Sequence, residues 1–212
     1  MKTITKKYDV YKFDELSEEI QEKLITERVE TEREIFCEWE LKTLMTEKAN
    51  NILKNTFTGF DNVNVVYDLS YSQGSGAMIQ FDMYIEDVNK KLKIFTDKEL
   101  EILTKGYCST LIKIRHNDNF YCHEYTFEII DSLDYCIDAA LYNEEITENK
   151  YNKLEKKLEN MRDLLKDIII GMNIDLKKYG YSLLEDFDYF KEQAVYTLSD
   201  YEYLENGTLF NV

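Results

Sequence analysis

His116 and His123 are the only two histidines of the chain, and they are the first residues to consider for chemistry. They fall in segments 108–116 and 120–130, which alternate as the two strands of a hairpin do. An even-numbered loop that pairs His116 with Tyr121 would make the two imidazoles diagonal neighbours, about 7–8 Å apart at Cα. This spacing raises the question of a metal site.

Two imidazoles alone do not make a catalytic zinc site, because zinc needs a third and a fourth ligand. Cys108 and Asp118 are candidates for these positions, and with a carboxylate such a set would indicate a small metal-assisted hydrolase. The alternative is a pair of half-buried rings, each satisfying one nitrogen locally. We favour this alternative and expect no metal and no cofactor.

A second polar set lies in Val63 to Ile85, which alternates as strand, serine- and glycine-rich turn, and strand. A three-residue loop, Gly74 to Gly76, brings the apolar residues of both strands to one face, because it pairs Tyr71 with Ile79. The loop and the opposite face then carry the candidate contact residues Asp68, Ser70, Ser72, Gln73, Gly74, Gly76, Gln80, Asp82 and Tyr84.

Asp68 lies directly opposite Asp82 in this register. Like charges in such positions are unfavourable unless a cation or a basic partner compensates them. We therefore take this face as a contact surface for a basic partner, with a solvated sheet face as the alternative. A phosphate cradle at Gly74 to Gly76 is not expected, because such loops lead into a helix and here a strand follows.

Helices are predicted around these hairpins. Asp14 or Ser17 can cap a helix whose first turn is acidic, with a break within Glu27 to Glu34 as an option before a second helix ends near Leu53. Thr96 and Glu99 form a capping box that predicts a short helix over 97–105.

A long helix is predicted over 147–179. Its apolar residues recur at steps of three and four and form one seam: Tyr151, Leu154, Leu158, Met161, Leu165, Ile168, Met172, Leu176 and Tyr179. The seam needs a partner, either an antiparallel helix of the same chain or a second copy, which would give a homodimer. Gly171 is expected to bend this helix.

These elements predict an α+β fold, with one antiparallel sheet built from the two hairpins, flanking helices and the long helix. Residues 90–95 are expected to extend the sheet, and 201–210 to form a small hairpin with an Asn-Gly turn. The chain is expected to be a single domain, 1–212, with 132–197 as a candidate helical subdomain.

The composition restricts the partners. With 42 acidic and 26 basic residues among 212, the net charge is −16, which argues against direct nucleic-acid binding and is compatible with a basic partner protein. Cys37, Cys108, Cys122 and Cys136 form no CxxC pair and are expected to be reduced. No leader and no apolar run of about 18 residues is present, so we expect a cytoplasmic protein away from membranes.

Four segments resemble a family of small proteins encoded in phages and prophages. They are YKFDELSEE (11–19), LSYSQGSG (69–76), YCHEY (121–125) and YLENG (203–207), in the order of the family's FDELSEEAKEKA, SQGDG, YxHE and FxxDG patterns. Ser75 departs from the pattern, which has Asp there, and the long helix is not part of it. The resemblance implies a phage accessory protein without an agreed activity.

Two functions follow as expectations. The first is an acidic binding protein that inhibits a host defence protein, such as a CRISPR effector, by occupying its basic nucleic-acid-binding surface in the host cytoplasm. The second is the metal-assisted hydrolase built on His116 and His123.

Overall fold

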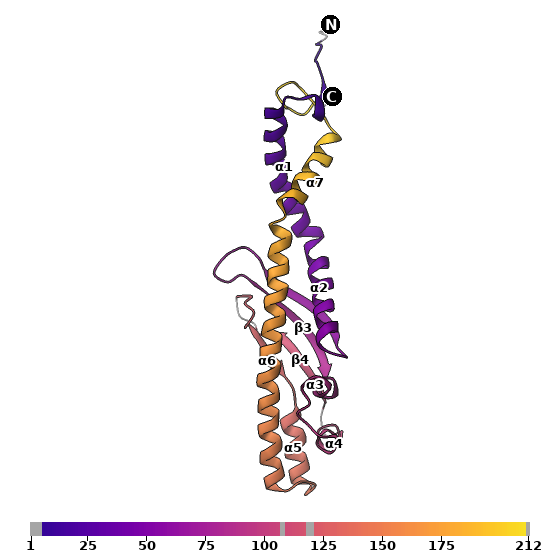
Figure 1. Ribbon diagram of the computed structural model, residues 1–212, viewed down its shortest axis with the longest axis vertical. Helices are drawn as coiled ribbons and strands as arrows, with labels where there is room; N and C mark the ends of the chain where they lie inside the picture. Colours follow the sequence, from indigo (N-terminus) through magenta and orange to yellow (C-terminus); the bar gives the residue numbers. More distant parts are fainter. Residues whose placement is uncertain (1–5, 107–108, 118–120, 211–212) are drawn as a thin grey trace, which may run out of the picture. The chain divides into compact units, whose positions relative to one another are not determined.

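The computed structural model describes residues 6–106, 109–117 and 121–210 (Figure 1). These residues form seven α-helices, a four-stranded antiparallel sheet and a two-stranded sheet, which confirms the predicted α+β class. They fall into two compact units: the helical unit, from residues 1–41 and 182–212, and the sheet unit, from residues 42–181. The stretch 132–197 contributes to both units.

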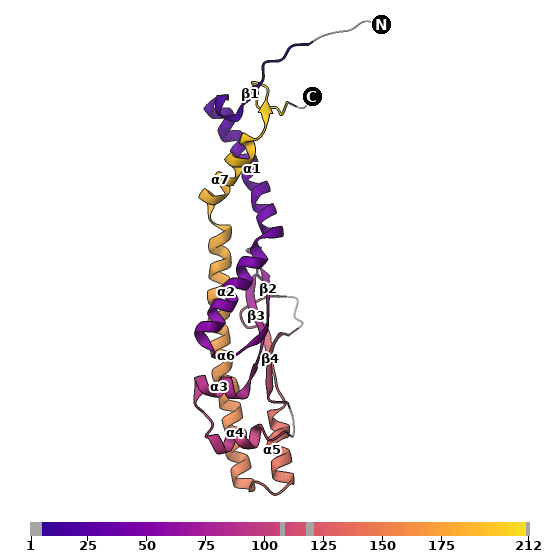
Figure 2. The same cartoon turned by 90° about the vertical axis from the view of Figure 1, so that its right-hand side faces the viewer.

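The sheet unit is built on four strands in the order β2-β3-β4-β5, with bounds Asp61–Asp68, Gly76–Tyr84, Leu111–His116 and Phe127–Ile130. Two helices, α2 (Leu41–Thr56) and α6 (Glu148–Leu184), lie along one face of this sheet (Figure 2). Ile79, Phe81 and Met83 alternate along β3 and are fully or almost fully buried. Phe57, just beyond α2, contacts the ring of Phe81 at 6.1 Å between centroids, as expected of a core between sheet and helices.

The first hairpin has the predicted parity but a different register. Asp68 pairs with Gly76 and Val65 with Ile79, so the loop spans residues 69–75 and has the expected odd length. The predicted pairing of Tyr71 with Ile79 is wrong, because the chain leaves the strand at Asp68 and Tyr71 adopts a positive φ of 57° in the loop.

The second hairpin also keeps its parity and shifts its register. His116 pairs with Phe127, not with Tyr121, and β5 begins at Phe127. Residues 117–126 therefore form a long loop, of which the structure describes residue 117 and residues 121–126.

Helix α6 contains the predicted long helix and continues without a break past Gly171. The central part of its seam, from Leu154 to Leu176, is buried within the same chain, with Ile169 in place of Ile168, whereas Tyr151 and Tyr179 at its ends are partly buried. Asn173 interrupts this apolar seam and is itself fully buried. Its Oδ1 accepts from the N–H of Ile79 at 3.0 Å and its Nδ2 donates to the carbonyl of Glu124 at 3.1 Å.

Shorter helices complete the sheet unit: α3 (Ile85–Leu92), α4 (Asp97–Leu103) and α5 (Leu133–Tyr142). The capping box of Thr96 and Glu99 is confirmed at α4. The strand predicted over 90–95 is wrong, because α3 occupies its first half and Lys93 ends that helix in the left-handed conformation. Arg162 joins α6 to the start of α5 through Asp131 at 2.8 Å and Asp134 at 2.7 Å.

The helical unit contains α1 (Glu18–Trp39) and α7 (Phe187–Ser199). Helix α1 runs through Glu27 to Glu34 without the break that the sequence allowed, because Arg28 pairs with Glu32 at 2.6 Å and Arg33 with Glu30 at 3.6 Å.

Segments close to the two ends of the sequence pair in this unit. Strand β1 (Tyr11–Lys12) leads into a 3₁₀ turn, Phe13–Glu15, and pairs with β6 (Glu202–Tyr203). Phe13, Leu16, Leu198 and Tyr203 form a small buried core. The predicted terminal hairpin is present around Gly207, with a bridge between Tyr203 and Leu209.

The cysteines differ in state. Cys37 and Cys122 are free thiols, whereas Cys136 is disulfide-bonded, so the prediction of a reduced thiol is wrong for Cys136. Cys108 lies outside the described residues. No helix in the described ranges is both long enough and apolar enough to cross a membrane.

Candidate functional site

Two of the motifs behind the family resemblance come together in the sheet unit. The 69–75 loop contacts the 121–126 loop, where the N–H of Cys122 donates to the carbonyl of Gly74 at 3.1 Å. The thiol of Cys122 donates to the carbonyl of Val66 at 3.1 Å. The serine- and glycine-rich phrase and the YCHEY phrase therefore form one paired-loop structure.

The glycines of this motif allow the close approach of the second loop. A Cβ on Gly76 would overlap the carbonyl oxygen of Cys122, and one on Gly74 would overlap the ring of Tyr121. The approach of another backbone thus explains both glycines, and no ligand is needed to account for them.

Three serine hydroxyls of the 69–75 loop bond to one another. Ser70 Oγ donates to Ser72 Oγ at 3.0 Å, and Ser75 Oγ lies 3.3 Å from each of them. The N–H of Ser70 donates to Asp68 at 2.9 Å, as in an Asx turn. These contacts hold the loop in place, while Gln73 at its tip is exposed.

The predicted juxtaposition of Asp68 and Asp82 does not occur. Asp68 lies at the end of β2 opposite Gly76, and Asp82 lies opposite Asp61 beside an irregularity in the ladder. The carboxylate of Asp82 is buried, accepts from Asn62 at 2.7 Å and pairs with Arg115. The chain thus compensates this charge internally, and no basic partner is required for it.

The rest of the predicted face is divided. Gln80 accepts from Asn64 at 3.3 Å across the strands, and Tyr84 is exposed at the end of β3. Of the nine predicted contact residues, the loop brings Asp68, Ser70, Ser72, Gln73, Gly74 and Gly76 together, and Gln80, Asp82 and Tyr84 follow along β3.

The histidines have local partners. His116 Nε2 lies 3.1 Å from the carbonyl of Tyr121, and the His123 ring lies 6.0 Å from that of Tyr121. Among the described residues, no group of three or more His, Cys, Asp or Glu side chains is placed to hold a metal ion. Cys108 and Asp118, the candidate further ligands, lie outside those residues.

Cys122 is not an activated nucleophile. Burial raises the pKa of its thiol to about 11, so the thiolate is scarce at neutral pH.

Most of the chain's excess negative charge lies in the helical unit, and not in the unit that contains the hairpin predicted as the contact surface. The 72 residues of the helical unit carry 19 acidic and 8 basic residues, a net charge of −11, whereas the 140 residues of the sheet unit carry 23 and 18, a net charge of −5. About two thirds of the chain's charge excess thus lies in one third of its residues.

Several carboxylates of this unit face solvent without an ion-pair partner in the described part of the chain. They are Glu18, Glu19, Glu22, Glu34 and Glu38 on α1, and Asp188 and Glu192 on α7. A charge count taken segment by segment would have identified this surface, whereas the total of −16 did not.

The contact between α1 and α7 combines apolar and charged groups. Phe36 contacts Phe190 at 5.5 Å, and the guanidinium of Arg33 lies over the rings of Phe187 and Phe190 at 5.1 and 5.6 Å. Glu32 accepts from Thr197 at 2.9 Å as well as from Arg28. The two arginines of α1 thus have partners inside the unit, whereas Lys23 lies exposed near Glu27, and the outer carboxylates outnumber it.

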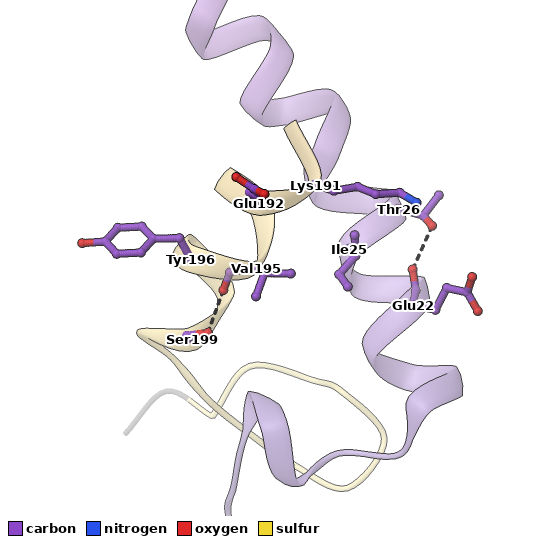
Figure 3. A pocket seen from close by; sticks show the side chains of 8 residues that line it. All are labelled: Glu22, Ile25, Thr26, Lys191, Glu192, Val195, Tyr196 and Ser199. Carbon is purple, nitrogen blue, oxygen red and sulfur yellow. Dashed lines mark hydrogen bonds between the residues drawn. The ribbon is translucent and has the colours of Figure 1, made fainter. Parts of the chain in front are cut away.

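An open groove of about 670 Å³ runs between α1 and α7 (Figure 3). Ile25 and Val195 face each other across it. Glu22 and Thr26 line it from α1, and the α7 side adds Lys191, Glu192, Tyr196 and Ser199. No local sequence signal indicates this groove, because it depends on the pairing of two helices that are about 150 residues apart.

The other two motifs of the resemblance meet in this same unit. Tyr11 pairs with Tyr203, and Gly207 packs so closely on Ile20 that a Cβ added to the glycine would lie 2.7 Å from an Ile20 methyl group. The four phrases therefore form two contacting pairs, one in each unit.

Comparisons with protein-family models, with curated proteins and with solved structures give no match to this chain. The resemblance to phage and prophage proteins therefore stays a prediction that rests on the four phrases.

Proposed function

We propose that this chain is a stoichiometric binding protein whose helical unit occupies a basic surface on a partner protein. The observation that carries the proposal is the net charge of −11 on this unit, with exposed carboxylates on both of its helices. Complementary potential accelerates encounter and aligns the partners.

The paired loops of the sheet unit are a weaker candidate for this contact. Their hydroxyls bond to one another, and the buried Asp82 is already paired with Arg115. A partner would have to compete with the hydrogen bonds of the buried Ser75 and Asp82, and buried polar groups that lose their partners are costly. The unpaired carboxylates of α1 and α7 carry no such cost.

The class of partner is suggested by two independent features. A strongly acidic surface suits a protein that itself handles nucleic acid, since such proteins carry basic stripes. The four phrases that resemble phage and prophage proteins support a host defence protein, such as a CRISPR effector, as the target.

Affinity capture tests the proposal. The tagged chain is incubated with bacterial lysate at about 0.05 M salt, where screening is weak, and the captured proteins are identified and their stoichiometry is measured. We expect to capture a basic protein at one-to-one stoichiometry. Double-stranded DNA should release it, because the DNA and this chain would compete for the same basic surface of that protein.

Two matched variants sharpen this test. In the helical-unit variant, Glu18, Glu19, Glu22 and Glu192 become Gln. In the sheet-unit variant, four exposed carboxylates become amides, namely Glu101, Glu155, Glu159 and Asp163. Capture should fail with the first variant and persist with the second. Equal capture by both variants, or turnover of a captured partner at far below one equivalent, would contradict the proposal.

A further inference from the structure

We propose that the groove between α1 and α7 binds a cationic amphipathic helix of the partner. This inference rests on the proposed function, because it specifies which part of the acidic surface makes the contact and what occupies it.

The groove offers apolar contact that the unit leaves uncovered. Val195 is 37% exposed, and Ile25, which packs against the small core, is partly buried. Both side chains point into the groove (Figure 3). An apolar seam between two helices is a common site for a third helix, which inserts residues spaced at i, i+3 and i+4.

The walls favour a helical occupant over an extended one. An extended peptide binds by adding main-chain hydrogen bonds to a free strand edge. Both walls here are α-helices, whose backbone groups are bonded within each helix away from the ends. A helix satisfies its own backbone, so it alone can enter without leaving polar groups unpaired.

The charges favour a basic occupant. The hydroxyl of Thr26 donates to the carbonyl of Glu22 at 2.8 Å, and that of Ser199 to the carbonyl of Val195 at 2.7 Å, so neither donor is left for a ligand. Each helix contributes one carboxylate to the lining, Glu22 from α1 and Glu192 from α7, and neither has an ion-pair partner in the described ranges. Lys191 is the single cation of the lining and would select one acidic position in the occupant.

The carboxylates continue along α1 beside the groove. A neighbouring hollow is lined by Glu19, Glu22 and Glu27, with Lys23 as the basic member. A helix lying in the groove would thus meet negative charge over more than one of its turns, whereas a nucleic acid or an anionic membrane would be repelled.

A designed peptide tests the groove directly. The probe is a fluorescein-labelled helix of about 14 Leu and Lys residues, which matches the length of α7 at about 1.5 Å per residue. A peptide of the same composition in scrambled order and a Leu-Glu helix are the control probes. Fluorescence anisotropy is measured with the full chain at about 0.1 M salt.

Three variants locate the binding. Val195→Arg should weaken binding of the Leu-Lys helix at least tenfold, because it places bulk and positive charge in the seam. Glu22→Gln with Glu192→Gln should weaken it severalfold. Glu34→Gln with Glu38→Gln changes the charge equally outside the groove and should leave it unchanged. Circular dichroism confirms that each variant is folded.

Two results would overturn the inference: scrambled or Leu-Glu peptides that bind as well as the Leu-Lys helix, or binding that Val195→Arg leaves intact. The proposed function can fail separately. If the captured partner is lost with the helical-unit variant but kept with Val195→Arg, the groove is wrong and the acidic surface stands. If the Leu-Lys helix binds as expected but no basic partner is captured, the groove stands and the proposed function is wrong.

Discussion

Gly76 and Gly171 lie in the same unit, but Gly76 is tightly packed and Gly171 is not, so alanine substitutions at the two positions can be compared. A Cβ on Gly76 would overlap the carbonyl of Cys122, which is backbone and cannot move aside alone, whereas a Cβ on Gly171 meets nothing within 4 Å. Gly76→Ala should therefore lower the free energy of unfolding by about 3 kcal/mol or more. Gly171→Ala should raise it by about 0.5–1 kcal/mol, since Ala is the better helix former.

Urea unfolding at equilibrium measures both changes. If Gly76→Ala unfolds like the wild type, the two loops do not pack as described, and the account of this motif is wrong.

Asn173 is a second residue whose role is structural. It is fully buried and supplies partners to the N–H of Ile79 and the carbonyl of Glu124. Asn173→Leu would leave the buried N–H of Ile79 without a partner, at a cost of about 1–3 kcal/mol, and would also remove the donor to the partly buried carbonyl of Glu124. We expect a loss of about 3 kcal/mol in the free energy of unfolding.

Asn160, exposed on the same helix, is the control. Asn160→Leu should change the free energy of unfolding by less than about 0.5 kcal/mol. Similar losses for both variants would show that Asn173 does not bridge helix and sheet.

At the scale of elements, the start of α4 links a capping box to α6. Glu99 accepts from the N–H of Thr96 at 2.8 Å and from the ammonium of Lys157 at 2.7 Å. Burial alone would raise the pKa of Glu99, but these hydrogen bonds outweigh it, so the pKa lies below its ordinary value. The charged form is thus the one that the folded state stabilises.

The pH dependence of stability follows from this direction. The contribution of Glu99 is complete above its ordinary pKa of about 4.5 and is lost as the pH falls through the lower pKa of the folded state. Glu99→Gln should therefore lower the free energy of unfolding by about 1 kcal/mol at pH 7, and its difference from the wild type should shrink below about pH 4. Glu101→Gln, at an exposed position, should show no such trend. A difference that stays constant with pH would contradict the role of the carboxylate.

Elements with a local signal were predicted well from the sequence. The capping box fixed α4, the apolar seam fixed α6, and the requirement that apolar residues share a face fixed the parity of both hairpins. The exact strand register of the hairpins was not predictable in the same way, because a shift by two residues keeps every side chain on the same face of the sheet. Both connecting loops are longer than the predicted tight turns, and residues 121–126 of the second loop pack on the 69–75 loop.

Contacts of charged side chains with residues far away in the chain could also not be predicted from the sequence. Nothing local indicates that Arg115 neutralises Asp82, or that Arg33 lies over rings from α7. Because Arg115 neutralises Asp82, this carboxylate no longer requires a basic partner, which was the main reason for predicting a contact face on the hairpin. The groove likewise forms only because α1 and α7, which are far apart in the sequence, pack side by side.

At the scale of the whole molecule, charge is distributed unevenly between two units of different construction. The sheet unit joins sheet and helices through buried polar bridges and internal ion pairs, such as those of Asn173 and Arg162. The helical unit is smaller, carries a net charge of −11 and exposes unpaired carboxylates on both helices. This difference supports our proposal that the helical unit, and not the sheet unit, contacts the partner.

The association rate constant of the captured partner, measured by stopped flow from about 0.05 to 0.5 M salt, tests this proposal most directly. The Debye length falls from about 14 Å to about 4 Å over this range. The rate for the wild type should fall steeply with salt. The helical-unit variant should associate at least about tenfold more slowly at low salt and respond less to salt, while the sheet-unit variant should stay within about twofold of the wild type. Equal effects of the two variants, or a wild-type rate that ignores salt, would contradict the account.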